Sequence, residues 1–312
     1  MNINPGIILD NRYRIVSLPR AGGMSLIYKA HDLKENRTVA IKVLKEDIIN
    51  KNEAILRMKK EEEIGLLLDH RNIARIYPPP EERSFYYQVM EYIEGITLDE
   101  FILKHRRLTV KNAIYIILQL LDAIEHMHSK GVIHQDLKPQ NILVVRGNEI
   151  KIIDFGLSYY RNSKYTLWKN LLAVGGTVAY MSPQRINGDI SSECDVFSAG
   201  VIFYQMLTGR LPYTETELIS FASNPRSKIT PKKISFYNRH IHPKLEEIAM
   251  KSISLEKDSR FSTASAFGFA ISRVAKQAIA YRKKEIDWFF IIVICLLFIA
   301  VFILIKLFLL FR

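Results

Sequence analysis

The sequence predicts an α+β fold in which short strands come first and longer helices follow. Apolar and polar residues alternate in short stretches before residue 45, as strands of a half-buried sheet require. Beyond residue 95 apolar residues recur at helical spacing. A third observation is the uncharged run from Trp288 to Ile305, close to the roughly 18 apolar residues of a membrane span. We therefore expect a strand-rich part, a helical part and a C-terminal transmembrane helix.

Composition narrows the class of protein only a little. A chain of 312 residues can form one large domain or two ordinary ones. Cys194 and Cys295 are far apart and lack metal-ligand spacing, which argues against a disulfide framework or a zinc ribbon and favours a reducing cytosol. The net charge of +12 would suit nucleic acid, anionic lipid or acidic substrates and does not distinguish them. Met1–Asp10 lacks the pattern of a secretory signal.

The first ninety residues favour strands around one helix. Tyr13–Leu18 and Leu26–Ala30 alternate apolar and polar residues, and Thr38–Val43 is β-branched and apolar, so a three-stranded meander is predicted. Phe85–Met90 predicts a further strand. Ile55–Leu68, which lies between them, has the apolar spacing of a helix.

That helix contains a glycine, and two more helical stretches follow. Gly65 costs a helix about 1 kcal/mol relative to alanine, so we expect the helix to be easy to displace. Leu98–Leu103 and Val110–His128 both predict helices, and the second is long and strongly apolar.

The chemistry of the chain is concentrated between residues 134 and 154. Asp136, Lys138 and Asn141 lie at fixed spacing in a loop, and Asp154 follows the next apolar run. Such a set suits phosphoryl transfer from a metal-bound nucleotide. Asp136 would hold an acceptor hydroxyl and take its proton, and Lys138 would reach the transferring phosphate. Asn141 and Asp154 would hold the Mg²⁺ ions that neutralise the phosphate oxygens.

These residues resemble the catalytic and metal-binding loops of the eukaryotic-like protein kinase family, whose pattern is H-R-D-x-K-x-x-N and then D-F-G. The resemblance covers about residues 13–274 and implies a two-lobed kinase domain, with a β-rich N-lobe at about 13–90 and a mainly helical C-lobe at about 95–274. It also implies ATP and Mg²⁺ as cofactors, with Mn²⁺ as an alternative metal. Lys138 and Thr177 match the serine/threonine branch of the family.

The nucleotide-binding residues follow from the same resemblance. Val39–Lys42 matches the V-A-I-K strand, so Ala40 and Lys42 would contact the nucleotide, and counting back from Leu68–Ile73 selects Glu61 as the partner of Lys42. Its neighbours in sequence, Glu62 and Glu63, are expected to be solvated.

The glycine-rich loop and the hinge between the lobes complete the implied nucleotide site. Gly22 and Gly23 resemble the loop in the form common in bacterial members, although Arg20 replaces the family's first glycine and Ser25 its third. The resemblance makes Met90 the gatekeeper. It implies that the backbone of two hinge residues hydrogen-bonds adenine, namely Glu91 and Ile93.

Two glutamines depart from the family pattern. Gln135 stands where an arginine usually pairs with a phosphorylated activation segment, so we expect phosphorylation at Ser163 or Thr166 to matter less here. Gln184 stands where a glutamate normally pairs with a distant arginine, matched by Arg260. Without that ion pair, we expect a less stable large lobe.

Three histidines near the catalytic loop need an explanation. His126, His128 and His134 could indicate a metal cluster, but two of them match positions of the family pattern. We therefore favour structural roles, with His134 packed in the core. Asp195, at the start of the family's central helix, is expected to support the backbone of the catalytic loop.

The C-terminal residues predict a membrane anchor. Residues 275–287 form a basic juxtamembrane segment, and 288–311 would form a single transmembrane helix. The basic flank before the span outweighs the one after it, which favours a kinase domain on the cytoplasmic side. The flanking cations are Lys276, Arg282, Lys283 and Lys284 before the span, against Lys306 and Arg312.

The sequence thus favours a membrane-tethered cytosolic serine/threonine kinase of bacterial type that phosphorylates proteins, itself included. Its expected partners are protein substrates with Ser or Thr acceptors, the lipid bilayer and a second copy of the chain, but no nucleic acid. A pseudokinase, or nucleotide-binding scaffold with little catalysis, remains as the alternative because of Arg20, Gln135 and Gln184. A small-molecule kinase is less favoured, since Lys138 and the segment around Thr177 resemble protein-substrate machinery.

Overall fold

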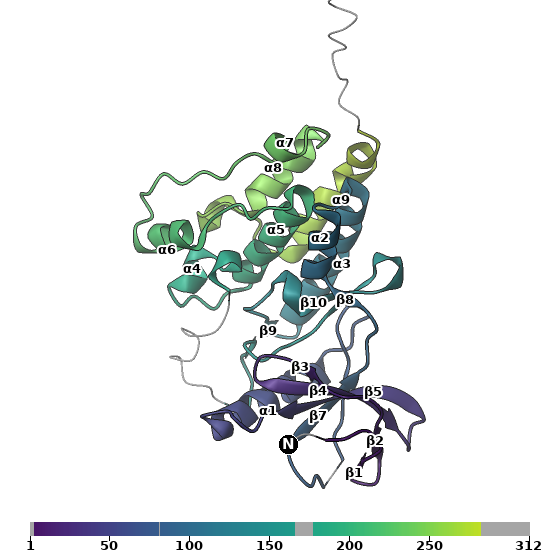
Figure 1. Ribbon diagram of the computed structural model, residues 1–312. Helices are drawn as coiled ribbons and strands as arrows, with labels where there is room; N and C mark the ends of the chain where they lie inside the picture. Colours follow the sequence, from purple (N-terminus) through teal and green to yellow (C-terminus); the bar gives the residue numbers. More distant parts are fainter. Residues whose placement is uncertain (1–2, 81, 166–176, 282–312) are drawn as a thin grey trace, which may run out of the picture.

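The computed structural model describes residues 3–80, 82–165 and 177–281. These form a small lobe rich in strands, which comes first, and a larger lobe built mainly of helices (Figure 1). The predicted α+β order of strands first and helices after is confirmed.

Within the described residues, seven strands make one antiparallel sheet in the small lobe, in the order β1-β2-β4-β5-β7-β6 with β3 beside β4. The long central pair runs from Ser25 opposite Leu44 to Asp32 opposite Arg37. The strands are β1 (Ile8–Leu9), β2 (Tyr13–Ile15), β3 (Arg20–Ala21), β4 (Ser25–Asp32), β5 (Arg37–Leu44), β6 (Ile76–Tyr77) and β7 (Tyr87–Glu91).

The glycine-rich loop is a short turn. The first strand of the meander ends at Ile15, and Arg20–Ala21 pairs with β4, with Arg20 opposite Ile27. The connection that remains is a tight turn in which the Gly22 amide donates to the Ser25 carbonyl oxygen at 2.8 Å. Arg20 therefore belongs to the sheet and stands at the edge of this turn.

Helix α1 (Lys51–Leu67) is continuous through Gly65, which is buried. A Cβ on Gly65 would lie 2.2 Å from Ile76 Cδ1 of β6. The glycine therefore permits close packing of the helix on the sheet. The end of the helix is also held, since Ile64 and Leu68 belong to the large-lobe core. The expectation that Gly65 makes the helix easy to displace considered helix propensity alone, without this packing, and it stays a prediction.

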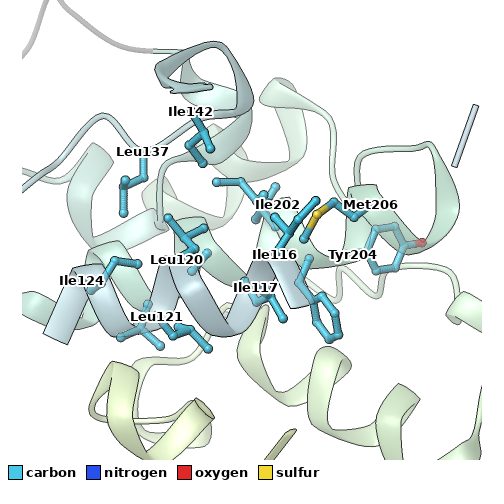
Figure 2. Packing of buried hydrophobic residues seen from close by; sticks show 14 of the residues in the cluster. Ile116, Ile117, Leu120, Leu121, Ile124, Leu137, Ile142, Ile202, Tyr204 and Met206 are labelled. Carbon is cyan, nitrogen blue, oxygen red and sulfur yellow. The ribbon is translucent and has the colours of Figure 1, made fainter. Parts of the chain in front are cut away.

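Two helices, α3 (Val110–Ser129) and α5 (Ser192–Thr208), form the centre of the large lobe, and their apolar side chains meet in its core (Figure 2). Thr109 begins α3 by accepting the Asn112 amide at 3.2 Å. Gly209 ends α5 at φ +71°, where a Cβ would meet a backbone oxygen. The other helices are α2 (Leu98–His105), α4 (Pro183–Ile186), α6 (Glu215–Ser223), α7 (Ile234–Tyr237), α8 (Pro243–Ser252) and α9 (Ala264–Ala280).

Short strands line the boundary between the lobes. One described sheet joins β8 to the hairpin β10–β11, and another pairs β9 with β12. The loops that follow β9 and β11 carry the residues predicted for catalysis and metal binding. These strands are β8 (Ile96–Thr97), β9 (Val132–Ile133), β10 (Ile142–Val144), β11 (Ile150–Ile152) and β12 (Tyr159–Tyr160).

The folded unit extends past both predicted limits of residues 13–274. Ile3 and Leu9 are buried in the small-lobe core, and α9 continues to Ala280, with Ala278 buried. The first part of the predicted juxtamembrane segment is thus the end of a domain helix. No helix in the described part of the chain is long and apolar enough to cross a membrane; the span predicted at 288–311 lies outside that part.

Alanine at Gly65 should destabilise the fold, although alanine is the better helix former. Crowding against Ile76 should cost about 1–3 kcal/mol of unfolding free energy, which exceeds the roughly 1 kcal/mol gained from helix propensity. Gly268→Ala in α9 is the matched control, because its Cβ would meet only atoms at 3.8 Å or more. Thermal unfolding should show a lower Tm for Gly65→Ala and an equal or higher one for Gly268→Ala. A raised Tm for Gly65→Ala would contradict this packing argument.

Candidate active site

A cavity of about 460 Å³ lies between the sheet of the small lobe and the loops of the large lobe. All nine residues predicted to bind the nucleotide or its metal line this cavity, and Glu61 lines it with them. The nine are Gly22, Gly23, Ala40, Lys42, Met90, Glu91, Ile93, Asn141 and Asp154. A second space of about 270 Å³ adjoins it and is lined by the predicted catalytic residues Asp136 and Lys138.

Apolar side chains that the motifs did not indicate also line the larger cavity. They come from both lobes and would enclose a flat ring from two sides. Leu18 and Ile27 lie in alternating stretches, and Ile153 directly precedes Asp154, but no local pattern places these side chains on the cavity. These residues are Leu18, Ile27, Ala74, Leu143 and Ile153.

Lys42 of β5 and Glu61 of α1 form an ion pair in which Glu61 is bidentate. Lys42 Nζ donates to the two carboxylate oxygens of Glu61 at 2.8 and 2.7 Å. Lys42 Nζ also lies 3.8 Å from Asp154 Oδ1. The pair therefore joins the sheet to the helix and aims the ammonium group at the loop after β11.

The charges of this cluster are set by their mutual contact. Burial acts to lower the pKa of Lys42, but Glu61 and Asp154 outweigh it and the pKa is raised. Burial acts to raise the pKa of Asp154, but Lys42 and the Gly156 amide outweigh it and the pKa is lowered. At neutral pH the cluster therefore presents an ammonium ion and an ionised Asp154 to the cavity.

The catalytic loop is held together by its own side chains. Lys138 Nζ lies 2.8 Å from Asp136 Oδ2. Asn141 Nδ2 donates to the Asp136 carbonyl oxygen at 2.9 Å and to its Oδ2 at 3.1 Å. These contacts use the carbonyl oxygen and Oδ2 of Asp136, so the loop fixes the carboxylate and leaves its second oxygen, Oδ1, for an acceptor hydroxyl.

Asp195 of α5 supports the catalytic loop from within the large lobe. It is fully buried and accepts the backbone amides of His134 and Gln135, both at 2.9 Å, and His128 Nε2 at 2.8 Å. Burial acts to raise the pKa of Asp195, but these donors outweigh it and the pKa is lowered. Gln135 is held at φ +65°, in the left-handed region. The expected supporting role of Asp195 thus has a direct structural basis.

The histidines have the structural surroundings expected for them. His134 is fully buried against Phe155, with ring centroids 5.4 Å apart, and burial lowers its pKa. His126 stacks on His70 at 5.2 Å. Among the described residues no group of three or more His, Cys, Asp or Glu side chains could hold a metal ion.

The side-chain oxygens at the cavity suit a hard cation whose remaining ligands come from phosphate and water. The side-chain amide nitrogen of Asn141 donates to Asp136, so the side-chain oxygen, Oδ1, is the atom left for a metal. The Asp154 side chain is 48% exposed and accepts the Gly156 amide at 3.1 Å through Oδ1. Two oxygen ligands suit Mg²⁺ when phosphate oxygens and water complete its octahedron.

At the hinge, the backbone of Glu91 has one group left for a ligand. The Glu91 amide donates to the Arg75 carbonyl oxygen at 2.8 Å, so only the carbonyl oxygen of Glu91 can serve a ligand. The Glu91 carboxylate accepts a hydrogen bond from Lys151 Nζ at 2.8 Å and is therefore already paired.

The two glutamines that depart from the family pattern differ in their hydrogen bonding. Gln184 accepts a hydrogen bond from Arg260 Nη2 and donates to the Leu255 carbonyl oxygen at 2.9 Å, so the amide keeps a bonded contact in place of the ion pair. Gln135 is buried, and neither atom of its amide has a hydrogen-bond partner in the described part of the chain.

Glu62 and Glu63 are paired, so the expectation that they are merely solvated was wrong. Arg83 Nη1 donates to Glu62 at 3.0 Å. Glu63 accepts the Ser163 hydroxyl at 2.5 Å and the Lys164 amide at 3.0 Å. The start of the activation segment is thereby attached to α1, a contact across 100 residues that no local pattern signals.

Two lobes enclosing a cavity, with this ion pair on one side and this catalytic loop on the other, define the protein kinase fold. The chain belongs to the protein kinase domain family, whose sequence profile matches residues 20–269. The serine/threonine-protein kinase PrkC of Bacillus subtilis is 35% identical over 257 residues, which cover 82% of this chain and 39% of PrkC. The serine/threonine-protein kinase PknB of Mycobacterium tuberculosis is 31% identical over 271 residues, covering 85% of this chain and 43% of PknB. The chain thus spans about two-fifths of the length of these relatives.

Removing the hydroxyl groups of the activation segment should leave substantial activity. Gln135 carries no charge to pair with a phosphate, and Ser158 is buried and bonded to the His134 carbonyl oxygen, so the test concerns Ser163 and Thr166. Ser163→Ala/Thr166→Ala should keep at least about a tenth of wild-type activity, a loss below the 1.36 kcal/mol that corresponds to tenfold in rate.

Ser163→Asp is the informative partner of that variant. It would place a carboxylate beside Glu63, and repulsion should move α1 and reduce the rate further than alanine does. Labelled-ATP assays on purified protein would compare the three. An aspartate variant more active than the alanine variant would contradict the geometry.

Proposed function

We propose that the chain is a serine/threonine protein kinase that transfers the γ-phosphate of ATP to hydroxyl groups of proteins, including its own. One observation carries the proposal: Lys42, Glu61 and Asp154 form a charged cluster on the same cavity system that Asp136 and Lys138 line. Family membership and the names of the bacterial relatives support it.

Each side chain would contribute position and charge. Lys42, held by Glu61, would bind phosphate oxygens of the nucleotide. The Asp136 carboxylate, fixed by Asn141, would orient the acceptor hydroxyl and take its proton. Lys138, already 2.8 Å from Asp136, would stabilise negative charge on the transferring group. None of these residues needs an unusual intrinsic reactivity.

Asn141 and Asp154 are the residues that would hold Mg²⁺, with Mn²⁺ as an alternative. The metal would neutralise charge on the phosphate oxygens during transfer. The apolar lining of the larger cavity would take the adenine ring, with the Glu91 carbonyl oxygen as one of its hydrogen-bond acceptors.

The alternative is a pseudokinase that binds nucleotide without efficient transfer. Arg20 lines the cavity where the family has glycine, which favours altered nucleotide affinity. However, Lys138 and Asn141 both contact the Asp136 carboxylate, which is the arrangement that phosphate transfer requires. A chain that only bound nucleotide would not need these contacts. We therefore prefer the active kinase.

Asp136→Asn and Lys42→Met should each remove most phosphate transfer. Loss of a general base or of a positioned phosphate ligand should lower kcat by at least about a hundredfold, or roughly 2.7 kcal/mol in the activation barrier. Single-turnover labelling with radioactive ATP, on the chain itself and on a generic basic protein, would measure this. Lys111→Met, at an exposed position of α3, is the matched control and should label as the wild type does. If Asp136→Asn labels as strongly as the control, another base must replace Asp136 in the proposal; if the wild type and the control do not label, the pseudokinase must replace it.

We further propose that the C-terminus anchors the chain in a membrane with the kinase domain in the cytoplasm. The support is the uncharged sequence from Trp288, whose length at about 1.5 Å per residue approaches a hydrocarbon core of about 30 Å. The larger number of cations before the run supports the orientation.

Deleting 288–312 should convert a membrane-bound kinase into one that is recovered without detergent and remains active. Fractionation of cells by high-speed centrifugation, followed by autophosphorylation assays, would compare the truncated and full-length chains. Full-length protein that stays in the supernatant without detergent would contradict the anchor.

A further inference from the structure

The segment between α6 and α8 carries a one-sided charge. Between Glu217 and Glu246 the sequence contains no acidic residue but six lysines and arginines. All six side chains are exposed, and none forms an ion pair within the described part of the chain. We call these residues the distal cationic face: Arg226, Lys228, Lys232, Lys233, Arg239 and Lys244.

The face lies on α7 and its flanking segments; α7 is at the end of the large lobe farthest from the small lobe, and the segment from α6 leads up to it (Figure 1). Arg107, which follows α2, extends it, because its Nη1 donates to the Tyr237 carbonyl oxygen of α7. Cations from two separate segments therefore meet on one side of the molecule.

An exposed aromatic ring stands among these charges. Phe236 is 68% exposed, and Lys232 Nζ lies 4.9 Å from the centre of its ring. One exposed apolar residue alone would need no explanation. An aromatic ring surrounded by lysines and arginines, however, is the composition of surfaces that rest in the interfacial layer of a bilayer.

The chain leaves the described structure beside this face. Tyr281, which follows α9, contacts His242 between α7 and α8, with ring centroids 5.1 Å apart. Seven residue steps separate Tyr281 from Trp288, where the uncharged run begins. At no more than about 3.6 Å per residue, they span at most roughly 25 Å. A chain anchored at Trp288 would thus keep this end of the lobe close to the bilayer.

We propose that the distal cationic face binds the anionic headgroups of the bilayer that holds the C-terminus. The large lobe then stands on the membrane with α7 and the end of α9 toward the headgroups, and the cavity between the lobes stays on the side away from them. This arrangement rests on the membrane anchor proposed above and adds a defined orientation and lipid class. Attraction between the face and the lipid would be electrostatic, so it should depend on lipid charge and on salt.

Hydrogen exchange on the full-length chain in nanodiscs tests the orientation without labels. Discs of phosphatidylcholine alone would be compared with discs in which part of the lipid is phosphatidylglycerol. Peptides from 225–240 should exchange several-fold more slowly in the anionic discs, while peptides from the small-lobe sheet should be unchanged. Raising the salt to about 1 M, where the Debye length falls to about 3 Å, should remove the protection.

Lys232→Glu/Lys233→Glu should abolish the lipid-dependent protection. Lys34→Glu/Lys51→Glu, with the same change in net charge at exposed small-lobe positions, is the matched control and should retain it. Equal exchange in both kinds of disc would overturn the orientation while leaving the anchor intact. A full-length chain that enters neither disc would instead overturn the anchor. Protection by single-stranded RNA in solution but not by anionic discs would assign the face to another polyanion and overturn the proposal.

Discussion

The contact on which the site depends is the ion pair between Lys42 and Glu61. It connects the central strand of the sheet with the one long helix of the small lobe, and Asp154 brings the large lobe within 3.8 Å of the same ammonium group. Breaking a buried pair by removing one partner typically costs about 3–5 kcal/mol, because the other charge is left uncompensated. Sheet, helix and metal-binding loop are therefore constrained together, and the cavity is the space that they enclose.

A second constraint, Asp195, acts from the opposite lobe. By accepting two consecutive backbone amides it fixes the path of the chain into the catalytic loop. Gln135 and Asp154 both have left-handed backbone angles, φ +65° and +70°. Such strain at non-glycine residues persists only where the surroundings determine the conformation, as Asp195 and Lys42 do here. Charged side chains from both lobes therefore hold the backbone of the site, Lys42 with Glu61 from the small lobe and Asp195 from the large lobe.

The sequence predicted features that local motifs carry, and it missed contacts between segments that are far apart along the chain. Motifs identified the residues of the cavity, and counting between motifs selected Glu61 among three adjacent glutamates. The packing role of Gly65 was missed because its partner, Ile76, lies on another element, about which a local propensity gives no information. The bond between Ser163 and Glu63 and the apolar lining from Leu18 and Leu143 were missed for the same reason: they join segments that only the fold brings together.

Helix α3 links the two ends of the large lobe in one element. Its middle packs against α9, where Gly268 approaches Leu118 and Leu121, and its last turn carries His128, which bonds Asp195. The segment that leads toward the proposed membrane anchor and the support of the catalytic loop therefore rest on the same helix. Since close-packed helices shift as units and transmit strain, a displacement of α9 would reach the support of the catalytic loop through α3.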